Sequence, residues 1–444
     1  MKTSSPKSSE QHRRQQQGEP LDGSPALRSG LSVPRLNEAA SALLRVLTFD
    51  YPADAVLGRY FRERPQLGQQ DRAFIAEAVF GVLRRKFWLD HLAPQANVRQ
   101  LLLLWLSRIA GHSSRELGTL CSSEELQWLN STRAQGPLPL AAEADLPPWV
   151  IDQLLPEHGE DFVRSLGRAL QEPAPLDLRV NTMCASREEV LAKLRSVGIS
   201  SENTPLSPLG LRLHDKPALN RQPLFAAGKF EVQDEGSQLL GYLLAPRRGE
   251  LVVDFCAGAG GKTLMLGAMM NSQGRLYAFD ISEKRLANLK PRLKRSGLSN
   301  VHPLVIAHEN DSKVKRLAGK IDRVLVDAPC SGLGTLRRNP DLKFRQSPQS
   351  VAELTVKQAA ILSSAARLVK PGGRLVYATC SLLAAENRMI VEAFLAAHPQ
   401  FVALNCGELL QRQGIAVGDM QQLQLWPQLH HTDGFFAAAF ERRS

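Results

Sequence analysis

The chain has 444 residues, of which 43% are hydrophobic, and this length predicts more than one folded domain. Its net charge of +11 at pH 7 suits a polyanionic partner such as nucleic acid, although a basic composition also simply favours solubility. The six cysteines are scattered without a CxxC pair, which argues against a zinc site and a disulfide framework and is typical of a reducing compartment. The N-terminus has no apolar segment of a secretory signal, and no apolar run is long enough to cross a bilayer. We therefore expect a cytoplasmic monomer with neither a metal nor a membrane segment.

The first two regions of the chain differ sharply in composition. Residues 1–35 are rich in Ser, Gln, Pro and Arg, which predicts a disordered tail. Between residues 36 and 144, apolar side chains such as Ala39, Ala42 and Leu43 recur with the period of a buried helical face. Because no strand pattern competes with this period, we predict a small all-helical domain over 36–144.

The next region, residues 145–230, mixes helix and strand signals. A helix is predicted to begin at Pro147-Pro148, a strand covers 176–181, and a second helix covers 187–197. These elements predict a small α+β module.

Strands alternate with helices from residue 231 to residue 444. Such alternation predicts an α/β fold, in which a parallel sheet has helices on both faces. Helices are expected to begin near residues 262, 282, 350 and 386. The predicted strands cover residues 251–253, 276–279, 304–306, 324–326, 375–377 and 434–440.

A glycine-rich turn, Asp254–Thr263, connects the first of these strands to a helix. A phosphate-binding P-loop would need glycine where this chain has Cys256. A dinucleotide fingerprint would need glycine where it has Thr263. S-adenosylmethionine has no phosphate and needs only a close-approach turn and a carboxylate for its ribose. Asp280 closes the next strand, where such a carboxylate belongs, although it could equally cap the following helix.

Two cysteines follow strands of the predicted parallel sheet. Cys330 lies in Asp327-Ala328-Pro329-Cys330, and Cys380 lies in Thr379-Cys380. Both positions are at the carboxyl edge, where ligands bind in such sheets. A free cysteine is ordinarily part of a core, but packing hardly explains two of them at this edge.

The chemistry of cytosine methylation accounts for this pair. Carbon 5 of cytosine becomes nucleophilic only after a thiolate has added to carbon 6, and cysteine is suited to that step. An acid near N3 must neutralise the ring, and Asp327 is placed for this role. A base or second group must then help to expel the thiol. Methylation of adenine N6 would need no nucleophilic cysteine, and DNA cytosine methyltransferases share only the Pro-Cys motif, so the second cysteine favours RNA.

These motifs resemble those of the Sun/Nop family of RNA cytosine-5 methyltransferases. The resemblance covers about residues 230–440, and Arg179-Val180-Asn181 also matches a segment that precedes the catalytic domain. It implies a Rossmann-like methyltransferase sheet, with Cys380 as the nucleophile and Cys330 assisting product release. It also implies that the cofactor, S-adenosylmethionine, is held by Cys256, Ala257, Gly258, Ala259, Gly260, Gly261, Lys262, Asp280, Asp311 and Asp327.

The chain departs from the family pattern at two points. Ala259 stands where the family usually has proline, which could loosen the turn without removing a contact. After the third strand, residues 308–311 offer several candidates for the expected acidic residue, of which we choose Asp311.

The region 36–144 resembles, in shortened form, the NusB-like RNA-binding domain of the RsmB type, which methylates 16S ribosomal RNA. The substrate is therefore expected to be 16S rRNA, with transfer RNA as an alternative. A catalytically inactive ribosome-assembly factor is a further alternative, but it would need neither cysteine. Arg84, Arg85 and Lys86 could grip phosphates or form a solvated face. The basic segment 336–345 after Cys330 is the better RNA-binding candidate, and the target base must be flipped out of its stack.

Overall fold

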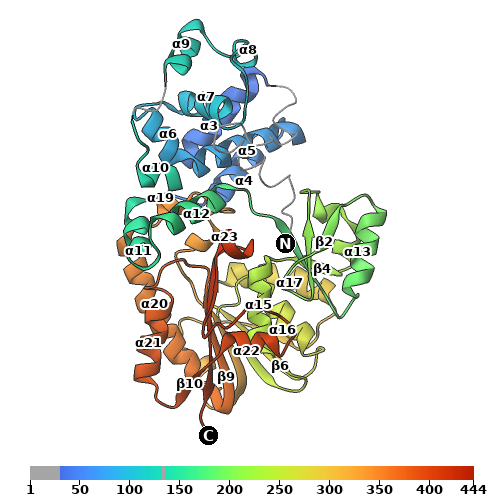
Figure 1. Ribbon diagram of the computed structural model, residues 1–444. Helices are drawn as coiled ribbons and strands as arrows, with labels where there is room; N and C mark the ends of the chain where they lie inside the picture. Colours follow the sequence, from blue (N-terminus) through green and yellow to red (C-terminus); the bar gives the residue numbers. More distant parts are fainter. Residues whose placement is uncertain (1–30, 133–135) are drawn as a thin grey trace, which may run out of the picture. The chain divides into compact units, whose positions relative to one another are not determined.

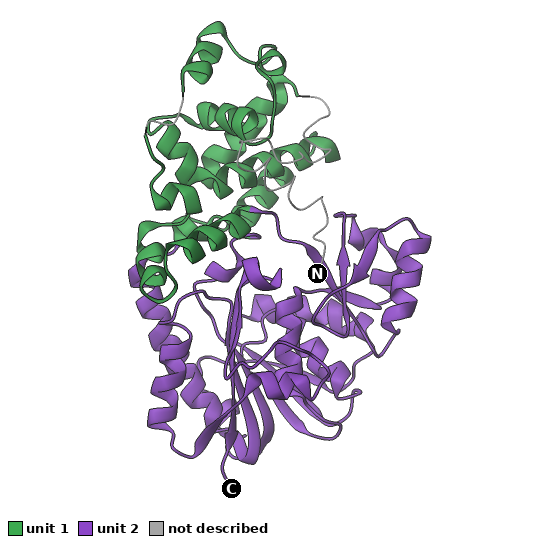
Figure 2. Ribbon diagram, in the orientation of Figure 1, with its two compact units in different colours: residues 1–171, 339–345 green, residues 172–338, 346–444 purple. Residues whose placement is uncertain are grey.

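The computed structural model describes residues 31–132 and 136–444 (Figure 1). Residues 1–30 of the predicted tail lie outside the described part, whereas its last residues enter α3 (Val33–Val46). The chain divides into two compact units, of which the first contains the chain up to Gln171 together with Asn339–Arg345, and the second contains the rest (Figure 2). The domain boundary expected at residue 144 thus falls inside the first unit, because α10 packs against both α6 and α12.

The first unit consists of helices throughout its described residues, as predicted. The residues of the apolar pattern in α3, among them Ala39, Ala42 and Leu43, are fully buried. At Gly81 a Cβ would lie 2.3 Å from the Trp105 side chain. Glycine therefore allows the helix that contains Gly81 to approach the helix that contains Trp105 closely. The remaining helices of the unit are α4 (Ala53–Glu63), α5 (Gln69–Arg84), α6 (Lys86–Leu92), α7 (Val98–Arg108), α8 (Ser114–Leu117), α9 (Ser123–Ser131), α10 (Leu140–Ala144), α11 (Pro148–His158), α12 (Glu160–Gln171) and α19 (Leu342–Arg345).

The segment Asn339–Arg345, which contains α19, contributes to the core of the first unit. Phe344 stacks on Phe49 and Phe87, with ring centroids 4.8 and 5.2 Å apart. Lys343 is buried, and its Nζ donates to the backbone carbonyls of Arg84 and Asp145, each at 2.9 Å.

The prediction that the basic segment 336–345 binds RNA stays a prediction, but its cationic side chains have partners within the protein. Lys343 is used inside the first unit, and Arg345 pairs with Asp341. Arg337 and Arg338, which belong to the second unit, both form ion pairs with the buried Asp433. Composition suggested a free basic surface, but long-range partners neutralise these charges. Arg85 and Lys86 likewise form ion pairs, with Asp145 and Asp90.

The second unit begins with a small antiparallel sheet of order β2-β3-β1-β4, which confirms the predicted α+β region. Its strands are β1 (Leu176–Val180), β2 (Ser201–Asn203), β3 (Gly210–Leu213) and β4 (Phe230–Val232). The helix α13 (Arg187–Ser196) packs against this sheet through Val190 and Leu194. Only β1 and α13 were predicted, since the other strands are too short to show a period. The segment before β4 contains η1 (Leu219–Arg221) and α14 (Pro223–Ala226).

An eight-stranded sheet of order β10-β12-β9-β8-β5-β6-β7 forms the rest of the second unit, with β11 paired to β12. The five strands from β9 to β7 are parallel, as predicted, whereas β10, β11 and β12 add antiparallel pairs at one side. The strands are β5 (Leu251–Asp254), β6 (Arg275–Asp280), β7 (Val301–Val305), β8 (Ile321–Asp327), β9 (Val369–Thr379), β10 (Phe401–Leu404), β11 (Leu423–Leu425) and β12 (Phe435–Arg442).

Helices cover both faces of this sheet. One face, with Val252 and Val376, packs against α15 (Glu235–Leu244), α16 (Gly261–Met269) and α22 (Cys406–Gln411). The other face, with Val253 and Tyr377, packs against α20 (Pro348–Ala366) and α21 (Arg388–Ala397). The helix after β6 is α17 (Glu283–Ser296). Three shorter elements connect the others: α18 (Ser312–Lys315), η2 (Leu333–Thr335) and α23 (Pro427–His430).

The strand order shows where along the carboxyl edge of the sheet a ligand is expected to bind. From β5 the chain proceeds to β6 and β7 on one side, and later to β8 and β9 on the other. Ligands bind at such a switch point, outside the carboxyl ends of the strands. Asp254 and Asp327 end the two strands that flank it. Within the described residues, no helix is both long and apolar enough to span a membrane.

Candidate active site

The glycine turn after β5 has the backbone geometry that only glycine adopts readily. Gly258 and Gly260 have φ angles of +56° and +82°. A Cβ at Gly260 would lie 2.2 Å from the Leu289 side chain, so the turn also passes close to α17. Cys256, at the start of this turn, is a neutral thiol, because burial raises its pKa well above the ordinary value.

Two arginines outside the turn hold its backbone. Arg179 of β1 donates from Nη1 to the carbonyl oxygen of Gly261 at 2.7 Å. Arg292 of α17 donates from Nη1 to the carbonyl oxygen of Ala259, also at 2.7 Å. The segment around Arg179, noticed in the sequence only for its resemblance, thus supports the cofactor turn from the small sheet.

The N-cap of α17 is Ser282, whose hydroxyl accepts from the N–H of Arg285, so Asp280 is not itself the cap. One carboxylate oxygen of Asp280 accepts from the backbone N–H of Ser282, at the start of α17, and the other accepts from the N–H of Gly258, each at 2.8 Å. Each oxygen has capacity for a second hydrogen bond. Asp280 therefore fixes the turn and can also accept bonds from ribose hydroxyls.

Asp254, the last residue of β5, was not singled out in the sequence. Its Oδ2 accepts from Thr263 Oγ1 at 2.7 Å, while its Oδ1 is buried with no partner among the described residues. Burial raises the pKa of Asp254 to about 7, although the hydrogen bond from Thr263 opposes the shift. An orphaned buried oxygen beside the turn suits a cofactor that brings a hydrogen-bond donor, such as the amino group of S-adenosylmethionine. The position of Asp254 at the end of β5 is the sequence feature that could have identified it.

Lys262 and Asp327 form an ion pair across the switch point. Lys262 Nζ lies 2.6 Å from Asp327 Oδ2, and the Asp327 side chain is 29% exposed. Burial alone would lower the pKa of Lys262, but the Asp327 carboxylate reverses this and raises it. Lys262 is therefore a cation that fixes one oxygen of Asp327 and leaves the carboxyl group open to solvent.

The structure brings Cys330 and Cys380 together. They follow the neighbouring strands β8 and β9, and their sulfur atoms are 3.4 Å apart. The N–H of Cys380 also donates to Cys330 Sγ at 3.3 Å. Both side chains are half-buried, unlike Cys406, which is buried in the core. A hydrogen bond to Cys380, followed by burial, raises the pKa of Cys330 well above the ordinary value. Cys330 is therefore a neutral thiol at neutral pH.

Glu386, which the sequence reasoning missed, connects the turns that carry both cysteines. Its Oε1 accepts from the N–H of Ser331 at 2.8 Å, and its Oε2 accepts from Ser331 Oγ at 2.5 Å and from Ser381 Oγ. Gln358 Nε2 donates to Oε1 at 3.0 Å. The side chain is fully buried. Because each serine directly follows a cysteine, this one carboxylate fixes the distance between the two sulfur atoms.

Asp311 lies after β7, the strand next to β6, but its carboxylate is used locally. It caps α18, accepting from the N–H groups of Ala307 at 2.9 Å and Lys313 at 2.8 Å. These backbone hydrogen bonds lower the pKa of Asp311. Among the described contacts, none joins it to the glycine turn.

This fold and site define a class of protein. A parallel sheet with a glycine turn at its switch point, a carboxylate at the end of β6 and no P-loop is the arrangement of S-adenosylmethionine-dependent methyltransferases. Residues 241–441 match the family model described as 16S rRNA methyltransferase RsmB/F. Residues 146–220 match the ferredoxin-like domain of RsmF/B-like methyltransferases.

Curated relatives agree with the family models. A probable ribosomal RNA small subunit methyltransferase B from Synechocystis is 32% identical, over 88% of this chain and 96% of the relative. The corresponding protein of Bacillus subtilis is 30% identical, over 85% of this chain and 92% of its own length. The chain belongs to the RsmB/F family of RNA methyltransferases, and S-adenosylmethionine is its cofactor.

Solved structures show the same fold. The crystal structure of PH0851 is 25% identical, with a TM-score of 0.77, and the match covers 93% of this chain and 100% of that one. NSun6 from Pyrococcus horikoshii, solved with SFG, is 21% identical with a TM-score of 0.60, over 68% of this chain and 99% of that one. Together with the family models and the curated relatives, this fold confirms the predicted Sun/Nop resemblance.

Proposed function

We propose that this protein methylates carbon 5 of a cytidine in 16S ribosomal RNA through a covalent bond between Cys380 and carbon 6. The observation that carries this proposal is the pair of sulfur atoms 3.4 Å apart at adjacent strand ends, beside the strand end that carries the Lys262–Asp327 ion pair. The printed names of the Synechocystis and Bacillus relatives support small-subunit rRNA as the substrate.

In the proposed mechanism the Cys380 thiolate adds to carbon 6, while Asp327, which is open to solvent, relays a proton from solvent to N3 so that the ring stays neutral. N3 returns this proton by the same route when the ring is restored. Bound S-adenosylmethionine supplies the methyl group as an electrophilic carbon. Carbon 5, now nucleophilic, carries both the methyl group and its original hydrogen until that proton leaves. A water molecule takes this proton, and the bond between Cys380 and carbon 6 breaks with its electron pair returning to Cys380. We assign Cys330 to this release, as a neutral thiol that donates a hydrogen bond to the departing Cys380 thiolate. Lys262 orients Asp327 throughout.

The remaining assignments follow the predicted regions. We assign residues 231–444 to catalysis, with the turn Cys256–Lys262 together with Asp280, Asp311 and Asp327 around the cofactor. Residues 36–144 and 145–230 would contribute RNA contacts, and the protein would act in the cytoplasm, where ribosomal RNA is found. The buried oxygen of Asp254 adds a further acceptor for the cofactor.

Cysteine variants test the mechanism. With labelled S-adenosylmethionine and unmodified 16S rRNA, Cys380→Ala should reduce methyl transfer by at least about 10⁴-fold, as expected for loss of a nucleophile. Cys330→Ala should instead accumulate a covalent protein–RNA adduct on a denaturing gel. Cys121→Ala, a half-buried cysteine of the first unit, is the matched control. Full activity of Cys380→Ala would refute the nucleophile, and methylation of transfer RNA alone would refute the substrate.

A further inference from the structure

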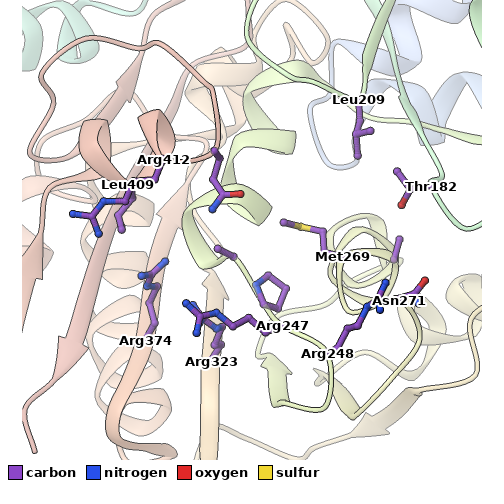
Figure 3. A pocket seen from close by; sticks show the side chains of 14 residues that line it. Thr182, Leu209, Arg247, Arg248, Met269, Asn271, Arg323, Arg374, Leu409 and Arg412 are labelled. Atoms are coloured by element: carbon purple, nitrogen blue, oxygen red, sulfur yellow. The ribbon is translucent and has the colours of Figure 1, made fainter. Parts of the chain in front are cut away.

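A second polar site lies at the opposite edge of the large sheet from the cysteines. A cavity of about 620 Å³ opens where β8 and β9 begin and where the chain enters β5 (Figure 3). Five of its lining residues are arginines: Arg247, Arg248, Arg323, Arg374 and Arg412. All of the lining residues belong to the second unit. The proposed catalytic chemistry uses none of them.

The sheet register places two of these arginines side by side. Arg323 of β8 and Arg374 of β9 are direct neighbours in the parallel pairing. Figure 3 shows Arg247 in the same part of the pocket, with Leu409 and Arg412 at one side and Arg248 at the other. Arg247, Arg248 and Arg412 are exposed, whereas Arg323 is 8% exposed.

Part of the arginine charge serves the fold. Arg323 and Arg374 donate from Nη1 to the carbonyl oxygens of Leu244 and Leu243, at 2.7 and 2.9 Å, and so cap the end of α15. Arg323 Nε also donates to Glu250 at 2.7 Å. If all five arginines served only the fold, the charges of the other arginines would also be paired within the protein.

Within the part of the chain that the structure describes, not all of these charges are paired. Glu250 pairs with Arg323, Glu408 pairs with Arg412, and the charge of Glu441 acts on Arg374. Arg374 Nε is buried without a hydrogen-bond partner in residues 31–132 and 136–444. Burial, followed by the charge of Arg323, lowers the pKa of Arg374 to about 10, and Arg247 acts in the same direction. Arg247 and Arg248 form no ion pair within these residues.

We propose that this pocket binds a phosphate group of the RNA backbone, at a distance from the base that is methylated. Planar guanidinium groups match phosphate oxygens in paired hydrogen bonds, and Arg374, which lines the cavity, has a buried Nε that makes no hydrogen bond within the described residues. The exposed arginines at the rim extend this positive surface, as a polymer of phosphates requires and a single ion does not. Such contacts position RNA without reading its sequence. The inference rests on the proposed RNA methyltransferase function.

The test compares two double variants with the same loss of charge. Arg247→Gln/Arg248→Gln removes exposed arginines of the pocket, and Arg316→Gln/Arg443→Gln removes exposed arginines elsewhere in the second unit. Binding of unmodified 16S rRNA is measured by filter binding over a series of salt concentrations. The pocket variant should bind about tenfold more weakly at low salt, with a slope of log K against log salt reduced by about 1 for each lost phosphate contact. Unaltered S-adenosylmethionine binding by the pocket variant shows that its fold is intact.

Two further measurements separate the possible outcomes. Equal losses in the two double variants would overturn the proposal, because the effect would then be one of net charge alone. Stabilisation of the wild-type protein by inorganic phosphate, lost in the pocket variant while rRNA binding stays normal, would also overturn it in favour of a free anion. Methyl transfer by the wild-type protein is recorded in parallel. Its absence would refute the proposed function, whereas normal transfer with unaltered rRNA binding in the pocket variant would refute the phosphate site alone.

Discussion

The two edges of the large sheet carry charge in different ways. At the carboxyl edge, Lys262 and Asp327 neutralise each other, and the buried Glu386 accepts hydrogen bonds from both cysteine turns. At the amino edge, positive charges outnumber negative ones, and Arg374 Nε lacks a partner among the described residues. Covalent chemistry needs groups fixed in position, whereas electrostatic binding needs charge that the protein has not already balanced. The carboxyl edge should therefore be sensitive in rate and the amino edge in RNA affinity.

Among the variants that compare the two edges, the largest loss of methyl transfer should come from breaking the Lys262–Asp327 ion pair. Lys262→Met leaves Asp327 without its fixed partner at the switch point, and methyl transfer should fall by about 10²-fold to 10³-fold, a typical cost of losing one preorganised donor. The rate at saturating RNA should fall, while the affinity for RNA changes little. The matched variant Lys284→Met, at an exposed position of α17, should retain its activity. If Lys262→Met lowered only the affinity for RNA, the proposed difference between the two edges would be contradicted.

Glu386→Gln should have the next largest effect. The amide replaces an acceptor by a donor facing Ser331 or Ser381, and this mismatch costs about 1–3 kcal/mol, or roughly tenfold to a hundredfold in rate. Because the Glu386 charge contributes to the raised pKa of Cys330, the variant should also lower that pKa. Alkylation of Cys330 at a series of pH values, followed by mass spectrometry, measures this shift. A purely structural role would leave the alkylation profile unaltered, as we expect for the exposed control Glu353→Gln.

A smaller effect concerns pH. With its pKa raised to about 7, Asp254 is neutral below that pH and charged above it. If its carboxylate accepts the cofactor amino group, affinity for S-adenosylmethionine should rise with pH through about 7, by at most about tenfold per pH unit. Calorimetric titration should show this slope in the wild-type protein and in Asp419→Asn. A slope that persists in Asp254→Asn would exclude Asp254 as its source.

The smallest effect on activity should come from the basic segment 339–345. Lys343→Met leaves two buried carbonyls without their donor and should destabilise the first unit by about 1–3 kcal/mol. RNA affinity should change less than twofold, in contrast to the pocket arginines. Hydrogen exchange in peptides of α5 and α6 measures the local stability, with Lys315→Met as control. An undiminished stability together with weaker RNA binding would restore the original interpretation of this segment.

The sequence could predict the location of those site residues that lie at or just after the end of a strand. The residue after a parallel strand lies at the carboxyl edge by geometry, so Cys330, Cys380 and Asp280 could be placed before the fold was known. Glu386 could not be identified in this way, because its partner Ser331 is remote in the chain and only the adjacent strands bring the two together. The intramolecular contacts of the basic segment could not be foreseen for the same reason, since Asp145 and Asp433 are distant from it in sequence. The strands β10 and β11 are too short to show a period.

The placement of Asn339–Arg345 within the first unit has a consequence for biosynthesis. A ribosome that has completed α12 has not yet made Phe344, so the aromatic stack with Phe49 and Phe87 must wait. When residue 345 has just been synthesised, β5 to β8 have been translated, but β9 and β12 have not. The helical unit therefore finishes its packing while the large sheet is still incomplete. A nascent chain arrested shortly after α12 should expose this aromatic surface to chaperones, and release from arrest should cover it.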